Sequence, residues 1–211
     1  MSIRNPSAAG GVIDPLSALG EVRAYRDGAE VCSQGGSADC VYRVVSGVVR
    51  TSRLTEDGRR QIGDFHFAGD LLALDDGEQH AFTAEALGAC EVLVIRRRTL
   101  EAQAGQDITV AQALWRASAE RLRKMQGHLI QLGRKTAIER VAAVLAQFAE
   151  QVERDVIDLP MSRQDLADYL GLTIETVSRM ISQLQASKVI RLTTLRQMRI
   201  CDPQALRQLA A

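Results

Sequence analysis

The sequence predicts an α+β fold in three parts: an N-terminal antiparallel β-roll of jelly-roll type, one long helix, and a C-terminal winged helix-turn-helix. Three observations predict it: short β-type runs separated by regularly spaced glycines, a heptad of apolar residues in the middle of the chain, and a two-helix pattern near the C-terminus. We therefore place the β-roll at residues 1–103, the long helix and its hinge at 104–135, and the winged unit at 136–211.

Glycines mark the expected turns of the β-roll. They recur at an interval of 11 residues, at Gly36, Gly47, Gly58 and Gly69. Strand-like runs lie between and after them, at Cys40–Val45, Val48–Leu54, Gln61–Phe67, Phe82–Ala86 and Cys90–Arg96. Short runs separated by turn glycines are typical of an antiparallel sandwich or barrel. Thr55–Gly58 is expected to form a hairpin loop.

A heptad predicts that the long helix is a dimerisation helix. One heptad position holds Ile108, Trp115, Leu122 and Leu129, and the other holds Ala111, Ser118, Met125 and Leu132. Such a seam favours pairing with the same helix of a second copy, and packing on the chain's own sheet is the alternative. Gly133 is expected to end this helix. A second amphipathic helix is expected over Ala137–Val152, with a buried face made of Val141, Val144, Leu145 and Phe148.

The segment from Ser162 onward reads as two helices joined by a tight turn. Ser162 is a good N-cap residue, with Asp165 three positions later as in a capping box. Gly171 supplies the turn and Thr173 caps the second helix. The apolar faces are expected to be Leu166, Ala167 and Leu170 on the first helix, and Val177, Ile181 and Leu184 on the second.

Three polar residues are expected on the outer face of the second helix. Glu175, Ser178 and Arg179 stand at i, i+3 and i+4, close to the helix N-terminus. That end of a recognition helix enters the major groove of DNA, where Arg can bind guanine O6 and N7 and Glu can accept from cytosine N4. The pattern predicts readout of a G·C pair. The alternative is an exposed Glu–Arg pair without a ligand.

The wing and the phosphate contacts complete this hypothesis. Val189–Leu192 and Gln197–Ile200 are expected to form the two strands of a wing. Residues 162–200 carry six Lys/Arg against three Asp/Glu, whereas residues 1–100 carry 11 against 14. This local excess of basic residues suits a surface that faces phosphates. The candidate contacts to the DNA backbone are Ser162, Arg163, Gln164, Thr173, Thr176, Arg191 and Arg196.

Composition and the missing motifs exclude other classes of protein. The chain of 211 residues has 26 Lys/Arg and 26 Asp/Glu, so no overall basic field indicates nucleic acid. We find no signal-peptide pattern, no apolar run near the roughly 20 residues of a membrane span, and no fingerprint of a known enzyme class. The four cysteines are scattered and form no metal or disulfide pattern. We expect a cytoplasmic protein that is not an enzyme and does not bind a membrane.

These features together resemble the CRP/FNR superfamily of bacterial transcription regulators, over nearly the whole chain. The most specific stretch is Leu172–Arg179, which is similar to the motif of the FNR and FixK branch. The resemblance implies a palindrome of TTGAT–N4–ATCAA type, read by the Glu, Ser and Arg that correspond to Glu175, Ser178 and Arg179. The cAMP-receptor branch has an additional Arg where Ile174 stands, so a site of that type is not expected.

The N-terminal half departs from the two best-known sensors of that superfamily. Gly69–Leu71 matches the Gly-Glu-Leu motif of the cyclic-nucleotide receptors except for Asp, but His80 and Ala81 occupy the positions of the phosphate-binding Arg-Ser pair. Met125–Gln126 replaces their purine-contacting Thr-Ser pair. Residues 1–31 contain no cysteine to ligate an iron–sulfur cluster. We therefore expect no cofactor, as in a FixK-type activator of microaerobic, nitrogen-fixation or denitrification genes.

Two further contacts are hypotheses, the first from the same resemblance and the second from the C-terminal residues. The acidic loop with Asp75, Asp76 and Glu78 occupies the family's polymerase-contacting position, which makes RNA polymerase an expected partner; a solvated hairpin tip is the alternative. The C-terminal Leu209–Ala211 resembles a tail recognised by a protease, and an ordinary frayed terminus is the alternative.

Two other functional hypotheses remain beside these. One is a ligand-responsive regulator of the same superfamily, for example a haem sensor that uses His66, His80 or Cys90. The other is redox control through Cys201, which follows the wing.

Overall fold

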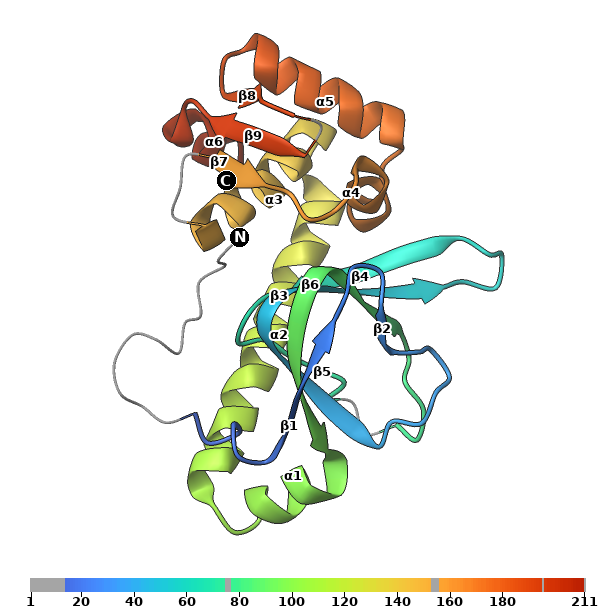
Figure 1. Cartoon of the computed structure of the whole chain (residues 1–211). Coiled ribbons are helices and arrows are strands. Elements are labelled where there is room, and N and C mark those ends of the chain that lie inside the picture. The colour runs from blue at the N-terminus through green and yellow to red at the C-terminus, as the bar shows by residue number, and fades with distance from the viewer. Residues whose placement is uncertain (1–13, 75–76, 153–155, 195, 211) are drawn as a thin grey trace. The chain divides into compact units, whose positions relative to one another are not determined.

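The computed structural model describes residues 14–74, 77–152, 156–194 and 196–210, with the side chains of residues 151 and 152 left out. The chain forms two compact units, Met1–Lys124 and Met125–Ala211. Helix α2 (Ile108–Arg134) begins in the first unit and ends in the second (Figure 1). Among the described residues, no helix is long and apolar enough to cross a membrane.

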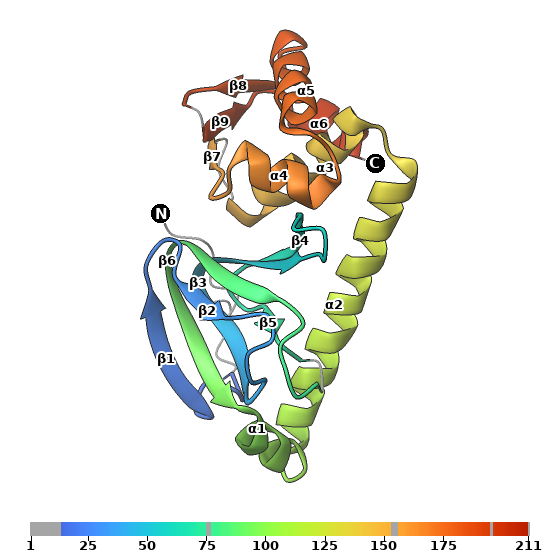
Figure 2. The same ribbon diagram turned by 90° about the vertical axis from the view of Figure 1, so that its right-hand side faces the viewer.

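The first unit contains an antiparallel β-roll. Its main sheet has the order β1-β6-β3-β4, in which β1 is Gly20–Tyr25, β3 is Cys40–Leu54, β4 is Arg60–His66 and β6 is Thr83–Arg96. Two short strands pair at its margins, β2 (Glu30–Cys32) with β6 and β5 (Leu71–Leu72) with β3. Figure 2 shows β3 and β6 as the long central strands. The predicted β-roll is confirmed.

The strand boundaries of the sequence prediction were wrong at two places. We predicted a break at Gly47 and another before Cys90, but β3 and β6 run continuously through both. The pairing of β3 with β6 shifts register on each side of Ser46, so the unequal residue numbers of the two strands are accommodated in a bulge rather than a turn. Gly47 lies in this bulge with a φ of 84°. The Thr55–Gly58 hairpin is confirmed, because the Thr55 N–H donates to the Arg59 carbonyl over 2.9 Å.

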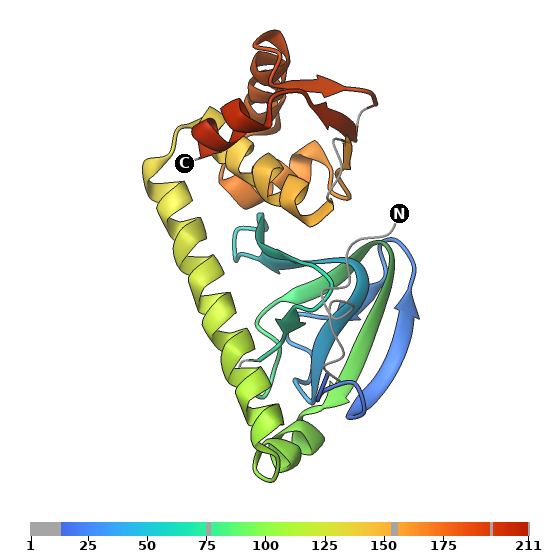
Figure 3. The ribbon, with the colours of Figure 1, turned by 90° about the vertical axis from the view of Figure 1, so that its left-hand side faces the viewer.

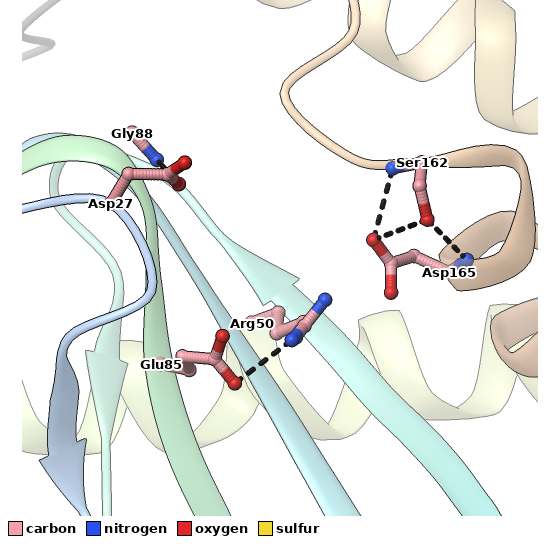
Figure 4. Close-up of polar contacts among 6 residues, drawn as sticks. All are labelled: Asp27, Arg50, Glu85, Gly88, Ser162 and Asp165. Atoms are coloured by element: carbon pink, nitrogen blue, oxygen red, sulfur yellow. Dashed lines mark hydrogen bonds and ion pairs between the residues drawn. The ribbon is translucent and has the colours of Figure 1, made fainter.

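Two apolar clusters and a few polar contacts hold the roll together. One cluster fills its interior with residues such as Val49, Leu72 and Val92. The other includes Leu100 of α1 (Arg97–Ala104) and Val110 of α2. Three polar contacts join distant parts of the unit: Arg50 pairs with Glu85 over 2.8 Å, the Gly88 N–H donates to Asp27 over 2.7 Å (Figure 4), and Lys124 pairs with Asp70 over 2.8 Å.

The second unit is a helical domain with a small sheet. Its elements are α3 (Ala137–Val152), β7 (Val156–Asp158), α4 (Arg163–Leu170), α5 (Ile174–Ala186), β8 (Ile190–Leu192), β9 (Gln197–Ile200) and α6 (Pro203–Ala210). The antiparallel sheet has the order β7-β9-β8, and Figure 3 shows α6 lying beside α3. The predicted buried face of α3 is confirmed, since Val141, Val144, Leu145 and Phe148 are at most 3% exposed.

Two details of this unit differ from the sequence prediction. Helix α2 does not end at Gly133 but continues to Arg134, and the Lys135 N–H still donates to the Gln131 carbonyl over 3.1 Å. The first wing strand begins at Ile190 rather than Val189. Strand β7 was not expected from the sequence, because three residues are too few to show a period.

Gly47→Ala should destabilise the β-roll far more than Gly88→Ala. Both glycines have positive φ, 84° and 82°, so both substitutions strain the backbone by about 1 kcal/mol or more. A Cβ at position 47 would also lie 2.6 Å from the Ala89 carbonyl oxygen and 2.6 Å from the Cys90 Sγ, whereas a Cβ at position 88 meets nothing within 4 Å. Overpacking should add roughly 1–3 kcal/mol. Urea unfolding of the two variants checks this, and equal losses would contradict it.

Candidate nucleic-acid interface

A capping box fixes the start of α4. The Ser162 Oγ accepts a hydrogen bond from the Asp165 N–H over 3.1 Å, and the Asp165 carboxylate accepts from the Ser162 N–H and Oγ, each over 2.9 Å (Figure 4). The side chain of each residue therefore accepts from the backbone N–H of the other. These N–H groups lie at the helix start, where no carbonyl of the helix itself can reach them. The cap predicted from the sequence is therefore confirmed.

A left-handed turn then separates the two helices. Gly171 has φ 61° and ψ 40°, and its N–H donates to the Ala167 carbonyl. The Thr173 side chain caps α5 by accepting from the Thr176 N–H over 3.2 Å. Ala167 is fully buried, as expected for a residue on the apolar face of α4. Both the turn and the second cap agree with the sequence prediction.

Helix α5 has one buried face and one polar face. Val177, Ile181 and Leu184 are at most 2% exposed, as predicted. Glu175 and Arg179 are exposed, and Ser178 is half-buried. A hydrogen bond from its own backbone N–H, and then one from the Thr173 side chain, hold the pKa of the Glu175 carboxyl below its usual value. The carboxylate is thus available as an acceptor at neutral pH.

Neighbouring polar groups orient this face. The Arg163 guanidinium donates to the Ser178 Oγ over 3.3 Å, and the Arg179 guanidinium donates to the Thr176 Oγ1 over 3.4 Å. The first contact links α4 to α5 at the polar face, and the second holds Arg179 beside the first turn of its own helix. A guanidinium has five N–H donors, so both arginines keep donors for a further partner.

The candidate backbone contacts come from both helices and the wing. Gln164 is exposed on α4, where its amide donates to the Asp168 carboxylate over 2.7 Å. Arg191 of β8 and Arg196, next to β9, are exposed. The hydroxyls of Thr173 and Thr176 lie 3.1 Å apart at the start of α5. The contact of these side chains with phosphate stays a prediction.

Arg140 is a structural residue that the sequence analysis missed. Its Nε donates to the Lys135 carbonyl over 2.9 Å, and its two terminal nitrogens donate to the carbonyls of Leu132 (2.7 Å) and Leu170 (3.0 Å). One side chain of α3 therefore satisfies carbonyls at the C-terminal ends of α2 and α4. The signal in the sequence that could have identified this role is the position of Arg140, a charged residue four positions before Val144 on the apolar side of α3.

The predicted dimer seam is largely exposed. Ile108, Trp115, Leu122, Met125 and Leu129 have exposed fractions of 53–77%, and Ser118 is also exposed. Ala111 and Leu132 are half-buried. Val110, which is off the seam, is 2% exposed and packs on the roll. Helix α2 therefore packs on the sheet by a face other than the seam. Packing on the chain's own sheet and pairing with a second copy, the two alternatives from the sequence, are thus compatible.

The residues considered for ligand sensing are held by ordinary packing contacts. His66 is buried with its ring nitrogen 3.2 Å from the Thr51 hydroxyl, and burial lowers the pKa of its imidazole. His80 is buried between the rings of Tyr42 and Phe82. The Cys90 Sγ donates to the Val48 carbonyl over 3.0 Å, and burial raises the pKa of that thiol.

The other candidates from the sequence analysis have mixed outcomes. No three or more His, Cys, Asp or Glu side chains in the described part of the chain gather as a metal site would need. Asp75 and Asp76 lie outside the described residues, and Glu78 is exposed. Ala211 also lies outside them, while Leu209 and Ala210 belong to α6, and the Ala210 carbonyl accepts from Lys135. Cys201 is exposed. The polymerase, protease and redox roles stay predictions.

Two helices joined by a glycine turn and followed by a two-stranded wing define the second unit as a winged helix-turn-helix, a DNA-binding class. Comparison with known domains agrees. Residues 139–209 match the Crp-like helix-turn-helix domain family, and residues 22–107 match the cyclic nucleotide-binding domain family.

Relatives and a solved structure extend this agreement to 92% of the chain. The nitrogen fixation regulation protein FixK of Azorhizobium caulinodans is 42% identical over 92% of this chain and 81% of its own length, and that of Rhizobium meliloti is 39% identical over 92% and 90%. The structure of FixK2 from Bradyrhizobium japonicum covers 92% of this chain and 98% of that one, with a TM-score of 0.85 and 42% identity. The chain belongs to the CRP/FNR family of transcription regulators, with FixK proteins among its relatives. It is a DNA-binding regulator and not an enzyme.

Arg140→Gln should loosen the attachment of α4 to the end of α2. The substitution removes hydrogen bonds from a charged donor to three carbonyls, which should lower the free energy of unfolding of the second unit by about 1.5–3 kcal/mol. Hydrogen exchange at Lys135 and Leu172 should accelerate, and Arg140→Lys should not restore it because one ammonium cannot span the same carbonyls. Arg134→Gln, at an exposed arginine of α2, is the control. Equal exchange in both Gln variants would contradict the role of Arg140.

Proposed function

We propose that the protein is a homodimeric activator that reads a palindrome of TTGAT–N4–ATCAA type through Glu175, Ser178 and Arg179 of each copy. The observation that carries this proposal is the polar face of α5. A Glu and an Arg are exposed within the first two turns of a capped helix whose opposite face is fully buried. That is the part of a recognition helix that enters the major groove.

The chemistry of the three side chains supports a site that contains a G·C pair. The Arg179 guanidinium can donate two hydrogen bonds to guanine O6 and N7, and the ionised Glu175 can accept from cytosine N4. Ser178 lies between them and is held by Arg163. The same arrangement of Glu, Ser and Arg in the FNR and FixK branch accounts for our choice of half-site. The backbone candidates would fix the register of the helix in the groove.

A palindrome requires two copies of the winged helix-turn-helix. The exposed seam of α2 is the surface that we propose for the pairing of these two copies. Five large apolar side chains are more than half exposed along that seam. A row of this kind at heptad spacing is stabilised when a second helix covers it. The proposed partner is the same seam of a second copy.

We propose that activation occurs in the cytoplasm and needs neither cyclic nucleotide nor an iron–sulfur cluster. His80, at the position of the phosphate-binding arginine of cyclic-nucleotide receptors, is buried against Tyr42 and Phe82. Asp70 is paired with Lys124. Contact with RNA polymerase would involve the loop that includes Glu78. Because the relatives are nitrogen fixation regulation proteins, we propose target genes for nitrogen fixation, microaerobic respiration or denitrification.

Arg179→Ala should weaken binding to the palindrome and relax discrimination at its G·C pair. The loss of a bidentate base contact should cost roughly 1–3 kcal/mol per half-site on the specific duplex and much less on a duplex with that pair changed. Fluorescence anisotropy with the full chain and no added ligand measures both affinities. Arg207→Ala on α6, also an exposed arginine, should leave them unchanged. An equal loss of affinity for both duplexes would mean that Arg179 holds only phosphate.

Leu122→Glu should dissociate the dimer, and Ile130→Glu should not. Leu122 lies on the seam, whereas Ile130 is equally exposed (57% and 60%) but lies outside the heptad positions. A carboxylate in the centre of an apolar seam is desolvated without a partner, which should raise the dimer dissociation constant at least about tenfold. Sedimentation velocity over a concentration series measures this. If both variants remain dimers, or both become monomers, the seam is not the interface.

A further inference from the structure

A cavity of about 260 Å³ opens in the second unit between the two helices and the wing. Its apolar lining comes from the loop before α4, from both helices and from both wing strands: Leu159, Met161, Leu166, Ile181, Leu192 and Met198. All of these except the half-buried Leu192 are at most 4% exposed. The cavity therefore reaches into the core of the winged helix-turn-helix.

The size and lining of the cavity suit a small apolar group. A cavity of about 150 Å³ lined by apolar side chains is enough to bind benzene, and pockets for drug-sized ligands begin near 300 Å³. Met161 and Met198 have unbranched, flexible side chains that adapt to the shape of what they enclose. A volume between these two values suits the short hydrocarbon chain of a small molecule.

Two arginines add a site for negative charge. Arg163 of α4 and Arg196 at the wing both line the cavity. Within the part of the chain that the structure describes, neither guanidinium is paired with a carboxylate, and Arg163 donates only to the Ser178 hydroxyl. Two guanidinium groups beside an apolar cavity are complementary to a carboxylate attached to an apolar chain.

We propose that this cavity binds a medium-chain carboxylate such as octanoate, with its chain among the apolar side chains and its carboxylate held by Arg163 and Arg196. The same two arginines are candidate contacts to the DNA backbone, and a guanidinium that holds the carboxylate has fewer donors for phosphate. Bound carboxylate therefore opposes DNA binding. Only this regulatory consequence rests on the proposed function; the binding site itself does not.

Binding is tested on the full chain without DNA, with methyl-labelled methionines followed by NMR. Octanoate should shift the Met161 and Met198 signals saturably and leave that of Met125, an exposed methionine on α2, unchanged. Acetate lacks the apolar chain and octanol lacks the charge, so both should bind at least about tenfold more weakly. Equal binding of octanol and octanoate would overturn the role of the arginines. No saturable shift at Met161 and Met198 would overturn the site.

Substitutions locate the two halves of the ligand. Arg163→Gln and Arg196→Gln should each raise the dissociation constant for octanoate about tenfold, whereas Arg191→Gln, on the same wing but outside the lining, should leave it unchanged. Leu192→Phe fills part of the cavity at a half-buried position and should also weaken binding. If Arg191→Gln weakens binding as much as the other two, general attraction to a basic surface accounts for the result and the proposal is wrong.

The regulatory consequence is measured by adding octanoate to the protein–DNA complex. Saturating octanoate should lower DNA affinity and reduce the slope of log K against log salt by roughly 1 to 2 per protomer, because two phosphate contacts are lost. At an octanoate concentration that just saturates the unsubstituted protein, Leu192→Phe should reduce the effect. Octanoate binding without any change in DNA affinity would overturn the competition but not the site. Failure of the protein to prefer the palindrome, with the methionine shifts intact, would overturn the proposed function alone.

Discussion

The left-handed backbone at Gly171 is the constraint on which the helix-turn-helix of α4 and α5 depends. α4 ends at Leu170 and α5 begins at Ile174, so three residues set the direction of the second helix. A residue with a Cβ is strained at a φ of 61°, and glycine is not. The direction of α5, and with it the position of the polar face proposed to contact DNA, follows from this one bend.

The two faces of α5 make that position unambiguous. Val177, Ile181 and Leu184 are almost completely buried, and Glu175 and Arg179 are on the polar side. A rotation of the helix by one residue in either direction would turn polar side chains, such as Ser178 or Thr176, toward the core and apolar ones toward water. Burying a polar group without a hydrogen bond costs roughly 1–3 kcal/mol, so the observed orientation is favoured. The buried face thus determines which residues lie on the polar face that we propose reads bases.

The sequence predicted what depends on neighbouring residues and missed what depends on distant ones. The caps at Ser162 and Thr173 are local interactions, so their spacing alone identifies them. The bulge at Gly47 depends on which residue of β6 lies opposite, and a glycine in isolation reads equally well as a turn. Gly133 has the residue type of a helix end, but Arg140 supplies the hydrogen bonds that such an end needs, from another helix. Neither effect can be predicted from the residues next to the glycine.

The arginines beside the cavity show how an assembled surface can acquire a second partner. Arg163 and Arg196 come from α4 and from the wing, and neither segment alone encloses an apolar space. A carboxylate and a phosphate both bind guanidinium through oxygen atoms, so one arginine cannot serve both fully. In the roll, His66 and Cys90 are already engaged in packing contacts. In the proposed scheme, control by a small anion acts directly on the groups that hold DNA, and needs no conformational signal from the roll.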